Sequence, residues 1–138
     1  MDIQAPTSPA TDAQRVVMDF FAALGDTAAL TGVFTEDATW TVWGDSPLAG
    51  IHIGREAVVS GFHAEAGKLF DPDYPGVLTV ERLIGDGPTV AAEFTYRTRT
   101  ALGRPYHNHY VEVFEVDGDR IRAVREYMDT AHFGAVCY

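Results

Sequence analysis

The residues with the clearest chemical potential lie in one stretch near the C-terminus, YHNHYVEVFEVDGDRIRAVREYMDT, at positions 106–130. Polar and apolar residues alternate on both sides of Asp117-Gly118-Asp119, and Asp-Gly supplies the positive φ of a tight turn, which predicts a long β-hairpin. Asp129, near the end of the second strand, is the first candidate for general acid–base chemistry, because desolvation by aromatic walls would disfavour its charged form. The alternative interpretation is a strand-end residue that caps the C-terminal tail.

Strict alternation places Arg125 and Tyr127 on the same face as Asp129, unless a bulge changes the facing. Arg125 could orient the carboxylate or neutralise a developing negative charge, and Tyr127 would then contact the substrate. The opposite face of this strand would carry Val124, Glu126 and Met128.

The first strand of the hairpin carries His107 and His109 two residues apart, hence on one face. Two imidazoles at this spacing could relay protons to the carboxylate or bind a metal ion, but His-x-His without a third ligand is a weak motif, so no metal is predicted. Solvated or edge histidines are the alternative. Asn108 would share the other face with Tyr106 and Tyr110, and alternation alone leaves open which face meets the helices.

Glu93 lies in the apolar run 90–94, where an ionised carboxylate needs a partner. Arg97 or Arg125 could supply it. A structural salt bridge is the favoured interpretation, and a contact with substrate is the other.

Aromatic and histidine side chains upstream could line a cavity or its mouth, although core packing is the alternative for most of them. They are Trp40, Trp43, Phe62, His63, Phe70 and Tyr74. Tyr96 could assist Asp129 in place of Arg125.

Composition limits the partners. The chain has 138 residues, 46% of them hydrophobic, which suffices for one globular domain with a single core. The net charge of −10 argues against nucleic acid and anionic membranes. No apolar run approaches the roughly 18 residues of a membrane span, and the N-terminus lacks signal-peptide features, so a cytoplasmic location is expected. A single cysteine, Cys137, predicts neither a disulfide framework nor a metal site.

The Pro, Ser and Thr residues of positions 1–10 predict a flexible segment, and hydrophobic periodicity predicts one domain at 11–138. Caps at Thr11 and Asp26 each begin a helix, and a third helix follows Gly54. The predicted strands are residues 38–43, 51–53, 77–84, 89–100, 106–116 and 120–129. Three helices must cover one side of a curved, mainly antiparallel sheet, giving a two-layer α+β domain. Because the layers diverge at one end, a cone with a cavity is expected.

This order of elements, the segment FTEDATWTVWGDSPLAGIHIGREAV and above all GRPYHNHYVEVFEVDGDRIRAVREYMDT resemble the NTF2-like superfamily, particularly its SnoaL-like branch. The resemblance extends from Thr11 to about Phe133. It implies a conical α+β barrel, a largely apolar cavity and frequent homodimers. The superfamily includes ketosteroid isomerases, limonene-epoxide hydrolases, polyketide cyclases, dehydratases and proteins that only bind, so the fold alone does not give the function.

Carried over position by position, the known catalytic patterns are incomplete. Asp129 matches the second Asp of the epoxide-hydrolase branch, and Arg97 matches the Arg of its Arg-x-Asp pair, but Arg99 stands where that Asp should be. Counterparts are also missing for that branch's Tyr-x-Asn and for the carboxylate base that ketosteroid isomerases place near Val42. Neither chemistry can be transferred intact.

Residues and resemblance together predict a small enzyme that needs no cofactor and applies general acid–base chemistry to an apolar polyketide-, terpenoid- or steroid-like molecule. Asp129 would transfer the proton, assisted by His107 or His109 and by Arg125 or Tyr96. The alternative is a module of the same fold that binds a hydrophobic ligand or forms a dimer without chemistry. A homodimer is expected in either case.

Overall fold

One strongly curved sheet of seven strands organises the computed structural model, which describes residues 1–138. The strands follow the order β1-β4-β5-β6-β7-β2-β3 across the sheet. Their bounds are β1 Asp2–Gln4, β2 Phe34–Val42, β3 Gly50–Ile53, β4 Val77–Ile84, β5 Thr89–Arg99, β6 Pro105–Asp117 and β7 Arg120–Met128. Strands β4 to β7 form an antiparallel meander, and β1 and β2 join it in parallel through β4 and β7. The α+β class and the mainly antiparallel sheet are confirmed.

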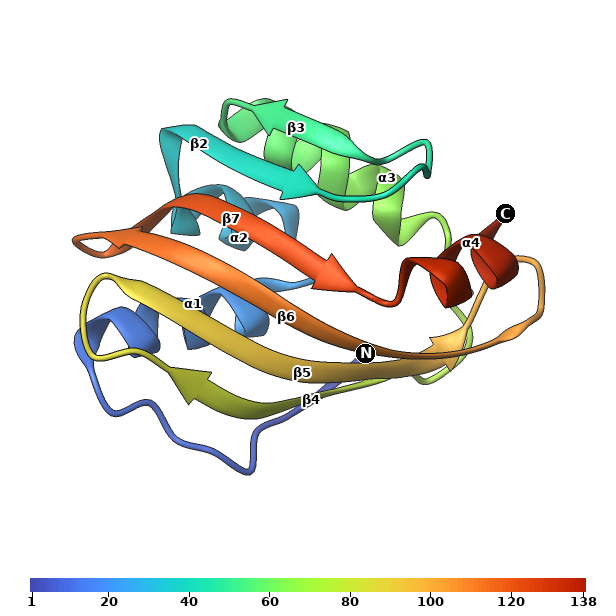
Figure 1. Ribbon diagram of the computed structural model, residues 1–138, viewed down its shortest axis with the longest axis horizontal. Helices are drawn as coiled ribbons and strands as arrows, with labels where there is room; N and C mark the ends of the chain where they lie inside the picture. The colour runs from blue at the N-terminus through green and yellow to red at the C-terminus, as the bar shows by residue number, and fades with distance from the viewer.

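The hairpin predicted at residues 106–129 is the β6–β7 pair. Its turn contains Gly118 with φ of 63°, a conformation that glycine adopts without steric cost. Pairing continues along both strands and brings Glu112 opposite Glu126. Figure 1 shows these two strands crossing the middle of the sheet.

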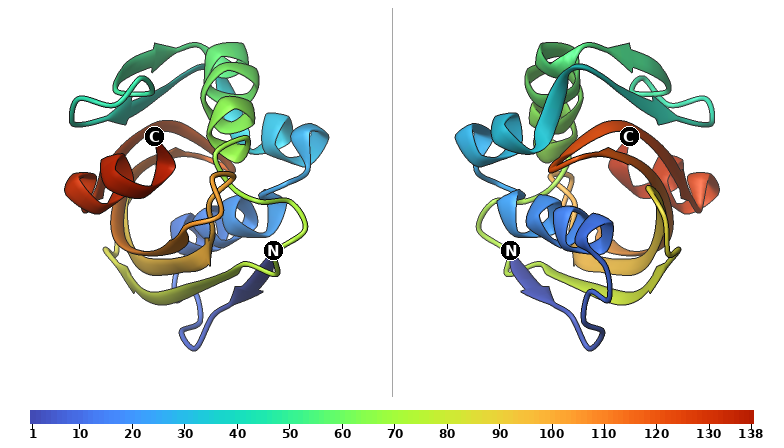
Figure 2. Two further views of the ribbon diagram at one scale, coloured as in Figure 1. Left: turned by 90° about the vertical axis from the view of Figure 1, so that its right-hand side faces the viewer. Right: turned by 90° about the vertical axis from the view of Figure 1, so that its left-hand side faces the viewer.

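The helices cover the concave side of the sheet, which curls around them in Figure 2. Those on this side are α1 Asp12–Ala23, α2 Thr27–Val33 and a π-helix η1 Ala57–His63 that continues into α3 Ala64–Gly67, whereas α4 Thr130–Cys137 lies at one end of the sheet. Thr11 caps α1 by accepting a hydrogen bond from the backbone N–H of Gln14, and Asp26 caps α2 in the same way with Ala29, as predicted. The predicted third helix is η1 with α3.

The core lies between α1 and the sheet. Phe20 and Phe21 of α1 pack edge to face against Phe114 of β6, and all three side chains are almost completely buried. Phe34 and Trp40 of β2 extend this cluster toward η1. The apolar side of α1 therefore faces the sheet.

Two elements differ from the sequence-based expectation. Residues 1–10 were expected to lack regular structure, yet Asp2–Gln4 pairs with the edge of β4 over three residues. The C-terminal tail contains the helix α4, whose low amphipathicity gave no periodic signal. This helix packs against β6 at one end of the sheet (Figure 1). No helix combines the length and apolar character needed to cross a membrane.

Candidate active site

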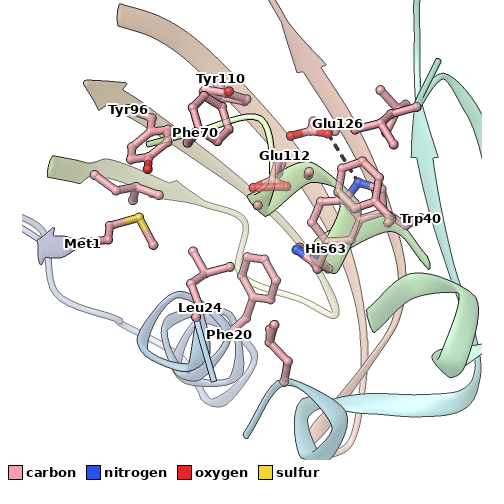
Figure 3. A pocket seen from close by; sticks show the side chains of 18 of the residues that line it. Met1, Phe20, Leu24, Trp40, His63, Phe70, Tyr96, Tyr110, Glu112 and Glu126 are labelled. Carbon is pink, nitrogen blue, oxygen red and sulfur yellow. Dashed lines mark hydrogen bonds between the residues drawn. The ribbon is translucent and has the colours of Figure 1, made fainter. Parts of the chain in front are cut away.

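A cavity of about 390 Å³ lies between the concave face of the sheet and the helices. It is lined by 23 residues, of which 17 are hydrophobic. Figure 3 shows the polar minority gathered at one side, where Glu112, Glu126 and His63 point into the same space. The chemistry available to this cavity depends on these three groups.

Strand alternation brings the two glutamates together. On β6 the inward face carries Tyr106, Asn108, Tyr110, Glu112 and Phe114. Glu112 is 2% exposed, and Glu126, its partner across the β6–β7 ladder, is 8% exposed. Residues directly opposite one another on adjacent strands project to the same side, so both carboxyls enter the cavity.

Burial raises the pKa of both carboxyls because desolvation disfavours the charged form. The pKa of Glu112 is raised further by the negative charge of Glu126. Burial raises the pKa of Glu126 to about 7, and the indole N–H of Trp40, which donates to its Oε2 at 3.4 Å, acts in the opposite direction. The pair therefore keeps a proton at neutral pH, with Glu126 as the carboxyl that ionises first.

His63, the last residue of η1, is the third polar group. Burial, and to a smaller extent the charge of His52, lowers its pKa to about 3, so the imidazole is neutral. Its ring lies 4.4 Å from that of Trp40, centroid to centroid. The Nε2 atom is buried and makes no hydrogen bond with the protein. A bound ligand could use this nitrogen.

Aromatic rings form much of the remaining wall. Trp40 stacks on Phe62 at 5.1 Å, and Phe94 stacks on Tyr110 at 4.6 Å, with the two rings of the second pair 5° from parallel. The hydroxyl of Tyr110 is hydrogen bonded to that of Tyr106. These pairs fix the shape of the cavity and present flat apolar surfaces to a ligand.

Five residues predicted to line a cavity or contact the substrate do line this cavity: Trp40, Phe62, His63, Phe70 and Tyr96. The other predicted site residues do not: Trp43, Tyr74, Glu93, Arg97, His107, Asn108, His109, Arg125, Tyr127 and Asp129. Of these, Glu93, His109 and Tyr127 instead border a separate hollow of about 280 Å³, which Glu81 also lines.

Asp129 was expected among aromatic walls, and this position is wrong. It is the N-cap of α4, where its side chain accepts a hydrogen bond from the backbone N–H of His132 at 3.0 Å. Asn108 binds the backbone of Asp129 through two hydrogen bonds. Its Oδ1 accepts from the N–H of Asp129, and its Nδ2 donates to the carbonyl of Asp129. The alternative interpretation of Asp129, a cap for the C-terminal tail, agrees with the structure.

The other residues proposed for catalysis also lie away from the cavity. His107 and His109 are exposed, and Arg125 forms an ion pair with Glu115 at 3.2 Å. Glu93 has the salt bridge that was favoured for it, but with Arg82 at 3.4 Å rather than with Arg97 or Arg125. The facing of the strands explains these positions, because all four predicted groups lie on residues that alternate with the inward ones.

Sequence reasoning missed Glu112 and Glu126, although a signal was present. Glu126 stands between Val124 and Met128 on its face of the strand, and Glu112 stands between Tyr110 and Phe114. A carboxylate in the middle of an apolar face is costly unless it is used or paired. In contrast, no group of three or more His, Cys, Asp or Glu side chains is arranged to hold a metal ion.

Residues 15–124 match the family model of the SnoaL-like domain. The chain belongs to this family. The matched region contains His63 and Glu112 and ends two residues before Glu126. No curated protein matches the chain.

Solved structures confirm the NTF2-like fold. An NTF2-like protein from Burkholderia xenovorans LB400 is 27% identical, with a TM-score of 0.77 over 95% of this chain and 100% of that one. Bal32a, from a soil-derived mobile gene cassette, is 25% identical, with a TM-score of 0.78 over 95% and 100%. An LEH-like epoxide hydrolase from M. tuberculosis is 21% identical, with a TM-score of 0.70 over 90% of this chain and 87% of that one, and its likeness concerns the fold alone.

Proposed function

We propose that this SnoaL-like domain is a small enzyme that applies general acid–base chemistry to an apolar molecule, with Glu126 as the group that transfers the proton. The observation that carries the proposal is the buried pair of carboxyls in a cavity that is otherwise mostly apolar. A catalytic acid or base works best when its pKa lies near the operating pH, and the surroundings of Glu126 raise its pKa toward that range.

The pair supplies both halves of a proton transfer. In its ionised form Glu126 accepts a proton from a carbon acid or from an attacking water, while the Trp40 N–H stabilises the carboxylate. Glu112, whose pKa is held higher, remains protonated and donates to a developing oxyanion of the substrate. Two carboxyls that share a site cannot both ionise readily, and this separates their roles.

The aromatic walls support a substrate of the polyketide, terpenoid or steroid class, because such molecules offer rings and methyl groups to flat apolar surfaces. Isomerisation, cyclisation, dehydration and epoxide opening all need the same proton-transferring group. Proton transfer by carboxyls requires no cofactor. The epoxide hydrolase from M. tuberculosis illustrates one chemistry that this fold hosts.

Binding without chemistry is the second candidate function. The predominance of hydrophobic residues in the cavity wall favours it, since a carrier needs only a shaped apolar space. The homodimer expected from the resemblance also stays a prediction, and analytical ultracentrifugation measures it directly.

The test is a turnover screen in D₂O with ketosteroids, terpenoid epoxides and aromatic polyketides, in which mass spectrometry detects both conversion and deuterium uptake. A hit is then repeated with Glu126→Gln, which we expect to lose at least ~100-fold in rate. Glu81→Gln is the matched control, because Glu81 is exposed, lies outside the cavity and loses the same charge.

Undiminished turnover in Glu126→Gln contradicts the assignment of the proton-transferring residue. Compounds that raise the melting temperature of the wild type without being converted or exchanged would favour the binding candidate.

A further inference from the structure

Apart from His63, the acidic and basic side chains that line the cavity are all acidic. Its lining includes two carboxyls but no lysine or arginine side chain. The other titratable side chains that face it are His63 from η1, Tyr96 from β5 and Tyr110 from β6. Burial lowers the pKa of His63 and raises the pKa of both tyrosines, so all three are uncharged at neutral pH. An anionic ligand would therefore find no cationic side chain in this wall.

The surroundings of the two carboxyls differ. Glu126 accepts a hydrogen bond from Trp40, whereas the pKa of Glu112 is raised by burial and by the charge of Glu126. A carboxylate in a low-dielectric site is stabilised by a hydrogen bond or a countercharge. Figure 3 shows the Glu112 carboxyl directed into the open space of the cavity. A ligand that enters this space is the partner that the fold leaves room for.

Aromatic rings lie close to both carboxyls. Trp40, whose ring stacks on Phe62, borders the Glu126 carboxyl, and Tyr110, whose ring stacks on Phe94, lies on the same strand face as Glu112. Aromatic faces attract cations through their quadrupole, and tryptophan does so most strongly. Two carboxyls in a cavity lined by aromatic rings form a typical environment for a positively charged amine.

We propose that the cavity binds an apolar molecule that carries a positive charge, a quaternary or protonated amine, with the charge between Glu112 and Glu126 and the apolar substituents against the rings. This inference rests on the proposed function in using the same site, and it narrows the substrate class. The net charge of −10 assists it, since a strongly negative protein concentrates cations near its surface.

Binding of such a ligand is coupled to protons. The cation takes the place of the proton that the two carboxyls retain, so binding releases protons to solvent and tightens as the pH rises. A neutral ligand of the same shape gains nothing from ionised carboxyls and does not show this dependence. The coupling distinguishes a true countercharge from simple hydrophobic binding.

The test uses three probes of similar size: benzyltrimethylammonium, its neutral carbon isostere neopentylbenzene, and the anion 4-tert-butylbenzoate. Affinity is measured by titration calorimetry with the full chain at about pH 6 and about pH 8, on either side of the midpoint at which the pair loses its first proton. At the higher pH we expect the cation to bind at least ~10-fold more tightly than the isostere. Titrations in two buffers of different ionisation enthalpy report the released protons.

Variants assign the effect to the pair. Glu112→Gln and Glu126→Gln should each weaken cation binding by ~10-fold or more, while the affinity for the neutral isostere changes little. Glu81→Gln removes an equal charge outside the cavity and should leave both affinities unchanged. Equal binding of cation and isostere, preferential binding of the anion, or no binding of any probe would each overturn the inference.

The outcome is separable from that of the proposed function. Cation-selective binding without any turnover of amine-bearing compounds leaves the ligand class standing and refutes the enzyme. Turnover of uncharged substrates together with equal binding of cation and isostere refutes the ligand class alone.

Discussion

The two faces of the β6–β7 hairpin carry the same types of titratable side chain in opposite states. On the inner face, burial raises the pKa of Glu112 and Glu126. On the outer face, a hydrogen bond from Thr89 and the ion pair with Arg125 lower the pKa of Glu115, only three residues from Glu112. Surroundings rather than residue type decide which carboxyl can exchange a proton at neutral pH.

The same contrast separates the two sites considered for chemistry. The outer positions are rich in histidine, arginine and tyrosine, and they are exposed or engaged in surface hydrogen bonds and ion pairs. The inner positions offer fewer polar groups, but these are desolvated and surround an open volume. A low-dielectric cavity amplifies each polar interaction, so a few groups there can do more chemistry than many groups at the surface.

The largest difference between the two faces should be seen in packing. Replacing Phe114, which is fully buried against α1, by alanine should lower the free energy of unfolding by about 3–5 kcal/mol. Val111→Ala on the outer face, where the side chain is 36% exposed, should cost less than about 1 kcal/mol. Urea denaturation of both variants measures the two values. Similar losses would contradict the assignment of inner and outer faces.

Sequence alone predicted much of the hairpin and little of its orientation. Alternation and the turn signals predicted both ends of β4 correctly and placed the ends of β5, β6 and β7 within one residue of those observed. They also grouped Glu126 correctly with Val124 and Met128, which lie on the inner face. The facing stayed open because Val111 and Val113 continue the face of His109, so both faces of β6 contain apolar residues.

The predicted location of the site depended on which face of β6 meets the helices. The aromatic and histidine lining was predicted in part, since Trp40, Phe62, His63 and Tyr96 do border the cavity. Asp129 was misplaced because a strand-end Asp and a helix N-cap Asp have the same sequence signal when the following helix lacks periodicity. Glu112 lies opposite Glu126 only because of the register in which β6 pairs with β7. This register could not be predicted from the sequence.

A second prediction concerns the energetic cost of the inner carboxyls. A carboxyl whose folded pKa is raised stabilises the fold most at low pH, and this stability is lost as the pH rises from the unfolded pKa to the folded one. Glu126→Gln removes the loss and keeps an acceptor for Trp40, so it should stabilise the fold by about 2–3 kcal/mol at pH values above 7 and by little near pH 4.

Glu115→Gln is the matched change on the outer face. Because its folded pKa is lowered, the carboxylate stabilises the fold above the unfolded pKa, and its removal should destabilise the protein at neutral pH. Chemical denaturation at the two pH values checks both signs. If the two Gln variants shift stability in the same direction, the contrast between the faces is wrong.

A third prediction uses the neutral histidine of the cavity. With a folded pKa of about 3, His63 binds fewer protons in the folded than in the unfolded state, so its contribution to stability is lost as the pH falls below about 6.5. Between pH 7 and pH 4, the wild type should therefore lose about 2–3 kcal/mol relative to His63→Leu. Unfolding free energies of both proteins, measured in urea at each pH, give this difference. Parallel pH curves would contradict a desolvated imidazole.

The fourth prediction tests the structural role of Asp129. Removal of an N-cap oxygen leaves first-turn N–H groups of α4 without an acceptor, so Asp129→Ala should cost about 1 kcal/mol. Asparagine caps helices about as well as aspartate, and Asp129→Asn should be nearly neutral for both stability and turnover. Thermal unfolding and the turnover assay check the two outcomes. A loss of turnover in Asp129→Asn with the fold intact would restore Asp129 as the catalytic residue.

The smallest effect is expected at the outer ion pair. Arg125 and Glu115 are partly exposed, with side-chain exposures of 38% and 19%, so solvent screens their attraction. Arg125→Met keeps the aliphatic contacts of the side chain and should change the free energy of unfolding by less than about 1 kcal/mol, with the difference disappearing at high salt. Denaturation at low and high salt measures it. A large loss that salt does not reduce would mean that the outer face is covered in solution, and this would remove the exposure on which its contrast with the inner face depends.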